Sequence, residues 1–504
     1  MNDLPVAALR AQSFKVAFMF PSFPIAPSTP VRRLLPVLLV SLLGACATVG
    51  PDYRVPETPV PAAWQAVSTV GTIPETGDGL ARWWEQLSDP QLTSLIEDAL
   101  GDNPDLRSAS AALRAARANR DLASANRFPT VGASTGVTRS TALGADKTLY
   151  AAGFDASWEP DVFGGARRAL EAAEADLDAS VADMRATRVS LVAEVALNYV
   201  ELRAYQARLA IARDNLGSQS ETLQITDWRA QAGLVGSLEV EQARSNRDTT
   251  RAAIPTLDSG RAAAEHRLAI LTGRTPGSLH EQLSKAGTET LPTLPRDIAL
   301  RIPAETLRQR PDVQAAERRL AAETARLGQA EAARYPSFSL SGSIGLQALG
   351  LSTFSGGGQI ARSLAGAVAG PVFDAGRLRA QVEIQDALRA QKRAAYDKAV
   401  LTALEDVQNA LVALSGGGER QQALISAVGA ARNAALLARH RYNAGLIDFQ
   451  TVLTTERTLL AVEDSLASAD AERVTALIQL YKALGGGWSP SEGMPSQITD
   501  GRDS

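Results

Sequence analysis

The sequence predicts a mainly helical chain with four strands of membrane-crossing length, arranged as two similar halves. Three observations lead to this prediction: an internal repeat, two very long stretches without proline, and four segments of alternating apolar residues. The 504 residues are 45% hydrophobic and 21% charged, which suits a folded chain with a large core. Aromatic residues make up only 5%. This low content favours closely packed helices over a sandwich of bulky strands.

Six short motifs recur at an offset that drifts only from 207 to 212 residues. The matched pairs are Asn103-Pro104-Asp105-Leu106 with Arg310-Pro311-Asp312-Val313, Phe128-Pro129-Thr130-Val131 with Tyr335-Pro336-Ser337-Phe338, Asp161-Val162-Phe163 with Pro371-Val372-Phe373, Ala232-Gly233-Leu234 with Ala444-Gly445-Leu446, Gly217 with Gly429, and Gly273 with Gly485. The period is too long for a solenoid, whose units run to roughly 20–50 residues. We therefore predict two structural repeats, 91–274 and 304–486, joined by a proline-rich linker at 275–303.

Alternating apolar residues predict two strands in each repeat. They span about 129–138 and 149–159 in the first repeat, and about 336–346 and 363–373 in the second, with loops at 140–147 and 348–362. Strands of roughly 10 residues fit a tilted membrane crossing. Four strands cannot close a barrel, because the smallest membrane barrels have about eight, and open edges are not tolerated in lipid. Two chains would supply eight strands and three chains would supply twelve.

The longest helices are predicted at about 164–232 and 375–444, within stretches that contain no proline. A seam of apolar residues with one four-residue skip runs along the first of them, as in a coiled coil with a stutter: Leu170, Leu177, Met184, Leu191, Val195, Leu202, Leu209, Leu216 and Leu223. At about 1.5 Å per residue this helix is on the order of 100 Å long. Gly233 and Gly445 stand where the long helices should end, so each repeat is expected to form an antiparallel helical hairpin.

The N-terminal residues 1–45 have the features of a secretory signal. Two arginines at 32–33 precede an apolar segment at 34–45, which is too short to span a bilayer comfortably. It ends in small residues before Cys46, as in a bacterial lipobox, so we expect a covalent lipid on Cys46. A short membrane anchor with an incidental Cys is the alternative. The start codon, Met1 or Met19, is left open.

Composition disfavours several other classes of protein. A net charge of −4 argues against a nucleic-acid-binding protein that relies on a general basic field. The single Cys excludes an internal disulfide and a metal site with several Cys ligands. Three His far apart in the sequence disfavour a zinc enzyme. No motif places a nucleophile beside a base, so we expect no catalytic residues, no metal and no cofactor other than the lipid.

Several short motifs, taken together, resemble those of a known family. They are Val49-Gly50-Pro51-Asp52-Tyr53, Trp83-Trp84, Asp89-Pro90, Arg310-Pro311-Asp312-Val313 with Ala315-Ala316-Glu317, Tyr335-Pro336, Arg441-Tyr442 with Gly445, and Thr451-Val452-Leu453. The chain is similar, from Cys46 to about Trp488, to the TolC-type outer-membrane efflux channels. Within them it resembles the lipidated NodT/OprM-like factors of resistance-nodulation-division (RND) systems.

This resemblance implies a homotrimer with a shared 12-stranded barrel in the outer membrane and a helical tunnel of roughly 100 Å across the periplasm. Segments 46–90, 275–303 and 487–504 would contribute a belt and a tail around the tunnel. The implied function is a passive exit duct for drugs and toxic compounds, with a periplasmic membrane-fusion adaptor and an inner-membrane RND-type pump as partners. A lipid-anchored periplasmic coiled-coil adaptor or scaffold is the alternative, but a scaffold needs no strands of membrane length.

The resemblance also implies that the tunnel closes at the hairpin turns in the periplasm. The family often has Asp nine residues after the turn glycine and an apolar residue five after it, where this chain has Thr454 and Gln450. Our hypothesis is that Arg441 and Tyr442 hold a closed tip through polar contacts with a neighbouring hairpin. The candidate acceptors are Asp448, Glu239 and Glu241. A solvated charged tip without such contacts is the alternative.

Overall fold

The computed structural model describes residues 48–57, 80–142, 145–284, 291–293, 309–350 and 359–489. They form two compact units. The first unit takes residues up to 55, 115–178 and 317–394, and the second takes 56–114, 179–316 and the residues from 395 onward. Each unit therefore contains corresponding parts of both sequence repeats, and neither unit is a repeat by itself.

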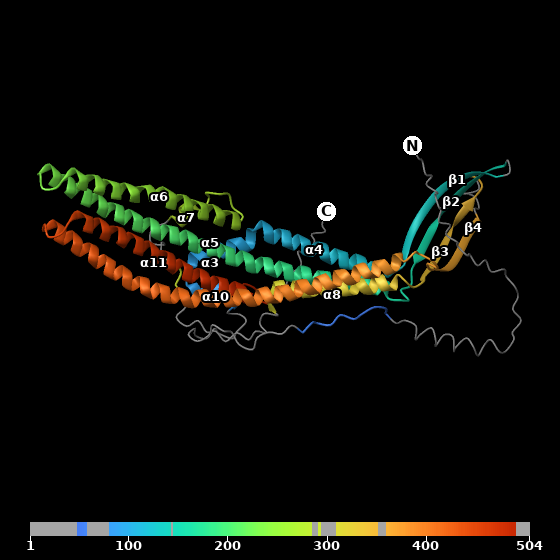
Figure 1. Ribbon diagram of the computed structural model, residues 1–504. Coiled ribbons are helices and arrows are strands. Elements are labelled where there is room, and N and C mark those ends of the chain that lie inside the picture. Colours follow the sequence, from blue (N-terminus) through green and yellow to red (C-terminus); the bar gives the residue numbers. More distant parts are fainter. Residues whose placement is uncertain are drawn as a thin grey trace, which may run out of the picture. The chain divides into compact units, whose positions relative to one another are not determined.

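The first unit contains one antiparallel sheet in the order β1-β2-β3-β4 (Figure 1). Its strands are β1 (Thr130–Ala142), β2 (Ala145–Trp158), β3 (Ser337–Ala348) and β4 (Gln359–Ala369). Strand β2 of the first repeat pairs with β3 of the second, so that Phe154 lies opposite Ile344. Among the described residues, β1 and β4 are the outer strands, and each pairs on one side only.

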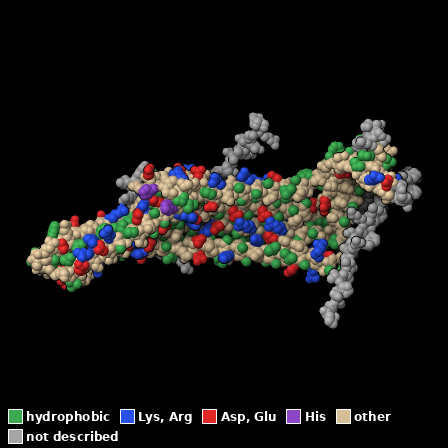
Figure 2. Space-filling view, turned by 90° about the horizontal axis from the view of Figure 1, so that it is seen from above, with side chains coloured by type: hydrophobic (Ala, Val, Ile, Leu, Met, Phe, Trp, Pro, Cys, Tyr) green, Lys and Arg blue, Asp and Glu red, His purple; other side chains and the backbone are tan. Residues whose placement is uncertain are grey.

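The two faces of this sheet differ in polarity. The strand register places large apolar side chains on one face, where they are 50–80% exposed: Val131, Val137, Phe154, Ile344 and Leu364. Figure 2 shows hydrophobic side chains gathered at the strand end beside a few charged ones, whereas many Lys, Arg, Asp and Glu are spread along the helices. The opposite face carries small and polar groups such as Ser134, which donates a hydrogen bond of 2.6 Å to Asp155. One apolar and one polar face is the pattern expected of a membrane strand.

The strand bounds differ from the sequence prediction in two places, the turn between β1 and β2 and the last strand. The loop predicted at 140–147 is wrong, because β1 continues to Ala142 and β2 begins at Ala145. Cross-strand contacts of Asp146 hold this extension, with Arg139 at 2.6 Å and Thr141 at 2.5 Å. The last strand lies at 359–369 rather than 363–373. It stops before Pro371, which has no N–H to donate to the ladder.

The long helix α5 (Gly165–Gln231) begins just after the sheet, and Asp161 caps its start. The Asp161 carboxylate accepts hydrogen bonds from the backbone N–H groups of Ala166 at 3.1 Å and Arg167 at 2.7 Å. One turn into the helix, Arg168 is almost fully buried. Its guanidinium donates to the carbonyl oxygen of Gly50 and to the Asp52 carboxylate. These contacts attach the segment that follows the predicted lipid site to the first unit.

The second unit is built from two antiparallel helical hairpins. Figure 1 shows α6 (Ser237–Leu271) returning beside α5, and α11 (Phe449–Ala483) returning beside α10 (Arg377–Asn443). Shorter helices complete the described residues, namely η1 (Trp83–Leu87), α3 (Pro90–Asp102), α4 (Pro104–Ala125), α7 (His280–Leu283) and α8 (Pro311–Ala332). None of the helices within the described part of the chain is long and apolar enough to cross a membrane.

The predicted heptad seam lies in the core of the second unit from its middle onward. The buried members on α5 are Leu191, Val195, Leu202, Leu209 and Leu223. The four-residue skip between the first two of these is therefore real, and both sides of the stutter face the core. Trp83 and Trp84 are also buried here, and the Trp83 ring stacks on Tyr481 with centroids 5.1 Å apart.

The two repeats end their hairpins with the same contact made by different side chains. Asn103 donates its amide N–H to the carbonyl oxygen of Leu271, at 2.9 Å, near the end of α6. Arg310, its counterpart at an offset of 207, donates to the carbonyl oxygen of Ala483, also at 2.9 Å, at the end of α11. The internal duplication seen in the sequence is thus present in the hydrogen bonding.

We predict that Arg310→Ala lowers the thermal stability of the second unit. The side chain is buried and also pairs with Asp312 and Asp406, so its removal leaves the carbonyl oxygen of Ala483 without the guanidinium donor. A lost hydrogen bond from a charged group costs about 2 kcal/mol. Circular dichroism melting in detergent measures the effect. The control Arg420→Ala removes an exposed pair with Glu472, and equal melting of the two variants would contradict the role of Arg310.

Candidate functional site

The two hairpin turns have the same backbone geometry. Gly233 and Gly445 both adopt positive φ, +73° and +72°. In each turn the glycine N–H donates three residues back, and the next N–H donates five residues back, from Leu234 to Arg229 and from Leu446 to Arg441. This is the Schellman arrangement, in which a left-handed residue ends the helix. Nothing lies within 4 Å of a Cβ at either glycine, so backbone conformation alone explains why glycine stands there.

A small apolar cluster joins the two hairpins behind these turns. Its buried members are Leu223, Val240, Ala243, Ala438, Tyr442, Phe449, Val452 and Leu453. The Tyr442 ring packs against Phe449 with centroids 5.2 Å apart. Burial, followed by the charge of Glu239, raises the pKa of the Tyr442 phenol above its usual value. The hydroxyl of Tyr442 is therefore a neutral, buried group that faces the first hairpin of the same chain.

Arg229 of the first hairpin binds Tyr442 of the second, a contact that sequence reasoning missed. Its guanidinium carbon lies 4.5 Å from the centroid of the Tyr442 ring. It also donates a hydrogen bond of 3.1 Å to the carbonyl oxygen of Tyr442. A cation over an aromatic face combined with a hydrogen bond to the same residue makes a specific link between the hairpins. One feature of the sequence pointed to a role for Arg229: it is the counterpart of the candidate gate residue Arg441 in the other repeat, at an offset of 212.

A second link between the hairpins involves Glu456, which is also absent from the sequence-based hypothesis. Its side chain is only 3% exposed. One carboxylate oxygen accepts hydrogen bonds from the Thr222 hydroxyl at 2.9 Å and from Arg439 at 3.0 Å. A buried carboxylate is stable only when such partners compensate its charge. Thr222 and Glu456 belong to different hairpins, so this pair also fixes their register.

The remaining candidate gate residues lie at the surface. Arg441 is exposed and makes no ion pair with any described residue. Gln450 and Thr454 are also exposed. Asp448 caps α11 by accepting from the backbone N–H of Thr451 at 2.9 Å and from its hydroxyl at 2.6 Å, and the hydrogen bonds from Thr451 lower the pKa of Asp448. Glu241 pairs with Arg244 at 2.6 Å. The described part of one chain thus brings Tyr442 and Glu239 together and offers Arg441 no ion-pair partner.

The remaining predictions concern the lipid site, the signal segment and metal binding. Cys46, the predicted lipid attachment site, lies outside the described residues, as does the predicted signal at 1–45. No group of His, Cys, Asp and Glu among the described residues has a metal-binding arrangement.

Comparison with known proteins identifies the family. The family model described as outer membrane efflux protein matches residues 95–274 and 302–486, which covers most of both repeats. The chain belongs to the outer membrane efflux protein family.

Individual relatives are similar along almost their whole length. Nodulation protein T of Rhizobium leguminosarum bv. trifolii is 34% identical over 465 residues, which cover 89% of this chain and 96% of that protein. The pyoverdine export outer membrane protein OpmQ of Pseudomonas putida is 35% identical, with 90% and 97% covered. The solved outer-membrane channel OprN has a TM-score of 0.83 and 38% identity, and the match covers 88% of this chain and all of that one.

The comparisons confirm the family resemblance and the main functional prediction. This outer-membrane efflux protein is a channel component and not an enzyme, and its place is the bacterial outer membrane. They also confirm the fold class, helical hairpins combined with a four-stranded sheet in each chain.

We predict that Arg229→Ala loosens the two hairpin tips of this efflux protein. The change removes both the ring contact and the hydrogen bond to Tyr442, at a cost of about 1–2 kcal/mol. Hydrogen exchange should become faster at the tip-proximal amides of α5 and α10. The matched control is Arg244→Ala, which removes only an exposed ion pair on α6. If exchange rises equally in both variants, Arg229 has no special role.

Proposed function

We propose that this protein is the trimeric outer-membrane exit duct of a tripartite efflux pump. The observation that carries the proposal is the four-stranded sheet, which has an exposed apolar face and two outer strands paired on one side only. Unpaired strand edges do not occur in lipid, so other copies of the chain complete the sheet. Three copies give a barrel of twelve strands, in keeping with the similarity to the channel OprN along the whole of that chain.

The energy for export comes from elsewhere in this proposal. The channel supplies a closed aqueous path, and an inner-membrane RND-type pump with a periplasmic membrane-fusion adaptor delivers the cargo. The printed name of OpmQ, a pyoverdine export protein, supports a role in export. We propose no cargo, because a passive duct carries what its pump delivers. The family match over both repeats favours this function over a periplasmic scaffold.

We further propose that the hairpin tips form the closed constriction and meet the adaptor. Arg229 and Arg441 are equivalent in the two repeats, but their surroundings differ. Arg229 binds Tyr442 within the chain, whereas the repeat counterpart of Tyr442 is Ala230. On an adjacent copy Arg441 therefore has no aromatic ring at the equivalent position, and its candidate partners are carboxylates such as the half-buried Glu239 or the exposed Glu241. Contacts between copies at the tip are thus weaker than contacts within a chain, as a constriction that must open requires.

The lipid on Cys46 is part of the same proposal. Small residues precede this Cys, and the lipobox pattern supports attachment. The segment that follows is held by Arg168 through Gly50 and Asp52. The lipid would therefore anchor a segment that is fixed to the sheet-containing unit.

We predict that Cys46→Ser abolishes lipidation. The mature wild-type chain should begin at Cys46 and carry acyl chains, whereas the variant should retain a signal that is not removed by the lipoprotein route. Mass spectrometry of the intact N-terminus decides the matter. An unmodified wild-type N-terminus at any other residue would exclude Cys46 as the lipid site.

We predict that the purified protein conducts ions in a planar bilayer in a mostly closed state. The double variant Arg441→Ser/Tyr442→Phe should show several-fold higher open probability, since three weakened contacts around the axis shift a closed state held by only a few kcal/mol. Arg420→Ser, which removes an exposed ion pair with Glu472 outside the candidate gate residues, is the control. A correctly assembled double variant that behaves like wild type would place the constriction elsewhere, with Gln450 and Thr454 the next positions to test. Absence of any conductance would contradict the duct itself.

A further inference from the structure

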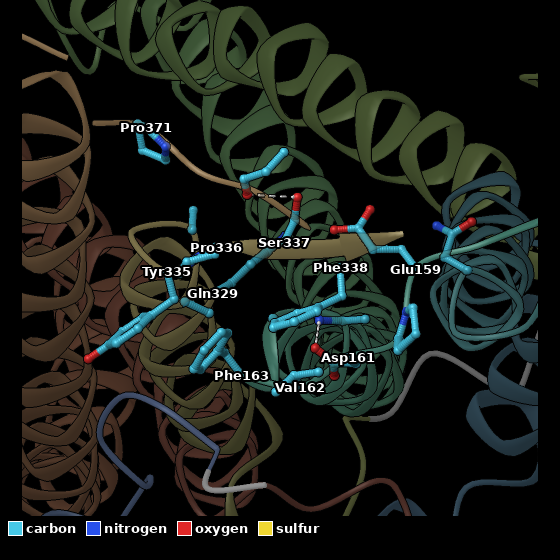
Figure 3. Close-up of a pocket in the computed structure, with 17 residues that line it drawn as sticks. Glu159, Asp161, Val162, Phe163, Gln329, Tyr335, Pro336, Ser337, Phe338 and Pro371 are labelled. Atoms are coloured by element: carbon cyan, nitrogen blue, oxygen red, sulfur yellow. Dashed lines mark hydrogen bonds between the residues drawn. The ribbon is translucent and has the colours of Figure 1, made fainter. Parts of the chain in front are cut away.

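A pocket of about 470 Å³ lies in the first unit where the first repeat meets the second (Figure 3). Phe163, after β2, stacks on Tyr335, before β3, with centroids 4.7 Å apart and planes inclined by 25°. The ring centroids of Phe163 and Phe338 lie 6.3 Å apart. This aromatic contact stands beside the pairing of β2 with β3, so it fastens the join between the two repeats.

The internal repeat assigns a counterpart to every member of this contact. Phe163 corresponds to Phe373 at an offset of 210, and Tyr335 corresponds to Phe128 at an offset of 207. Phe338 corresponds to Val131, again at 207. A second contact of the same kind would therefore join Phe373 to Phe128 and Val131.

Within one chain these counterparts cannot meet, because they flank opposite edges of the sheet. Phe128 and Val131 lie at the start of β1, and Phe373 follows β4, which are the two outer strands. Their side chains are uncovered: Phe373 is 89% exposed, Phe128 65% and Val131 71%. Phe163, by contrast, is half-buried. Three large apolar side chains without cover at two strand edges need a partner.

The chemistry of the two edges identifies the partner as a second copy of this chain. The in-chain pocket contains the carboxylates of Glu159 and Asp161. Their repeat counterparts, Ala369 at the end of β4 and Pro371 just after it, also line this pocket and bring no charge to that edge. Gln329 of the in-chain pocket is likewise replaced by Leu122, which is 61% exposed. The edges are thus more apolar than the in-chain pocket. They suit association between copies better than the binding of a polar ligand.

We propose that Phe373 of one copy stacks on Phe128 of the next, in the arrangement that Phe163 and Tyr335 show within the chain. The contact closes an apolar pocket lined by Leu122 and Val131 at each junction between copies. It is a head-to-tail interface, which closes into a ring when the rotation between copies fits. The inference rests on the proposed trimeric duct and names the residues at its junctions.

Cysteine cross-linking in whole membranes tests this junction. Phe128→Cys/Phe373→Cys, treated with a short bis-maleimide, should give bands of two and three chains on denaturing gels. The control Phe163→Cys/Tyr335→Cys should react within one chain and remain at single-chain mobility. Each single variant should give no multimer. The wild-type chain, whose only Cys is Cys46, shows how much cross-linking occurs without the introduced cysteines.

The outcomes separate the junction from the oligomer. The mass of the untreated complex in detergent is measured on the same preparation. Multimer bands from Phe128→Cys/Phe373→Cys alone support the proposed junction. If this variant gives only single-chain bands in a complex with the mass of three chains, the proposed contact is wrong but the proposed trimeric duct is not contradicted. A complex that weighs one chain overturns both. Multimer bands from the Phe163→Cys/Tyr335→Cys control would also overturn the inference, because the aromatic contact used as its template would then not lie within a chain.

Discussion

A strand in lipid has no water to satisfy its backbone, so every N–H and C=O group must bind another strand. Among the described strands, β2 and β3 meet that requirement on both sides, whereas β1 and β4 meet it on one side only. The face with Val137, Phe154 and Leu364 adds a second requirement, because these exposed apolar side chains need lipid around them. Both requirements are met when identical chains continue the sheet into a closed barrel, and the functional proposals depend on that closure.

The internal duplication favours closure of the barrel, because a contact between the two repeats of one chain can recur between the second repeat of one copy and the first repeat of the next. The equivalent bonds of Asn103 to Leu271 and of Arg310 to Ala483 show that the repeats keep their contacts even where the side chains change. At the hairpin tips the repeats have diverged. Arg229 has an aromatic partner, and its counterpart Arg441 has none among the residues that the structure describes. On the proposed function, this divergence is what a tip that must open would need.

Much of this fold could be predicted from the sequence, because periodicity and glycine or proline positions act locally. The helical hairpins, their turns at Gly233 and Gly445, and the heptad stutter all follow from such patterns. The end of β1 and the start of β2 could not be predicted, because these residues do not alternate between apolar and polar. Hydrogen bonds from Arg139 and Thr141 to Asp146 extend the pairing of the two strands there. Links such as Arg229 with Tyr442, or Thr222 with Glu456, join residues more than 200 positions apart. The internal repeat relates Arg229 to Arg441, but it does not show which side chain of the other hairpin either arginine contacts.

The central claim is that the sheet is completed by two further copies of the chain. Native mass spectrometry of the lipidated protein, released gently from detergent, counts the chains in the functional complex directly. The account predicts three chains, with no smaller species that retains ion conductance after separation. A stable single chain that conducts in a bilayer would contradict it, because the four described strands would then cross a membrane with two edges unpaired.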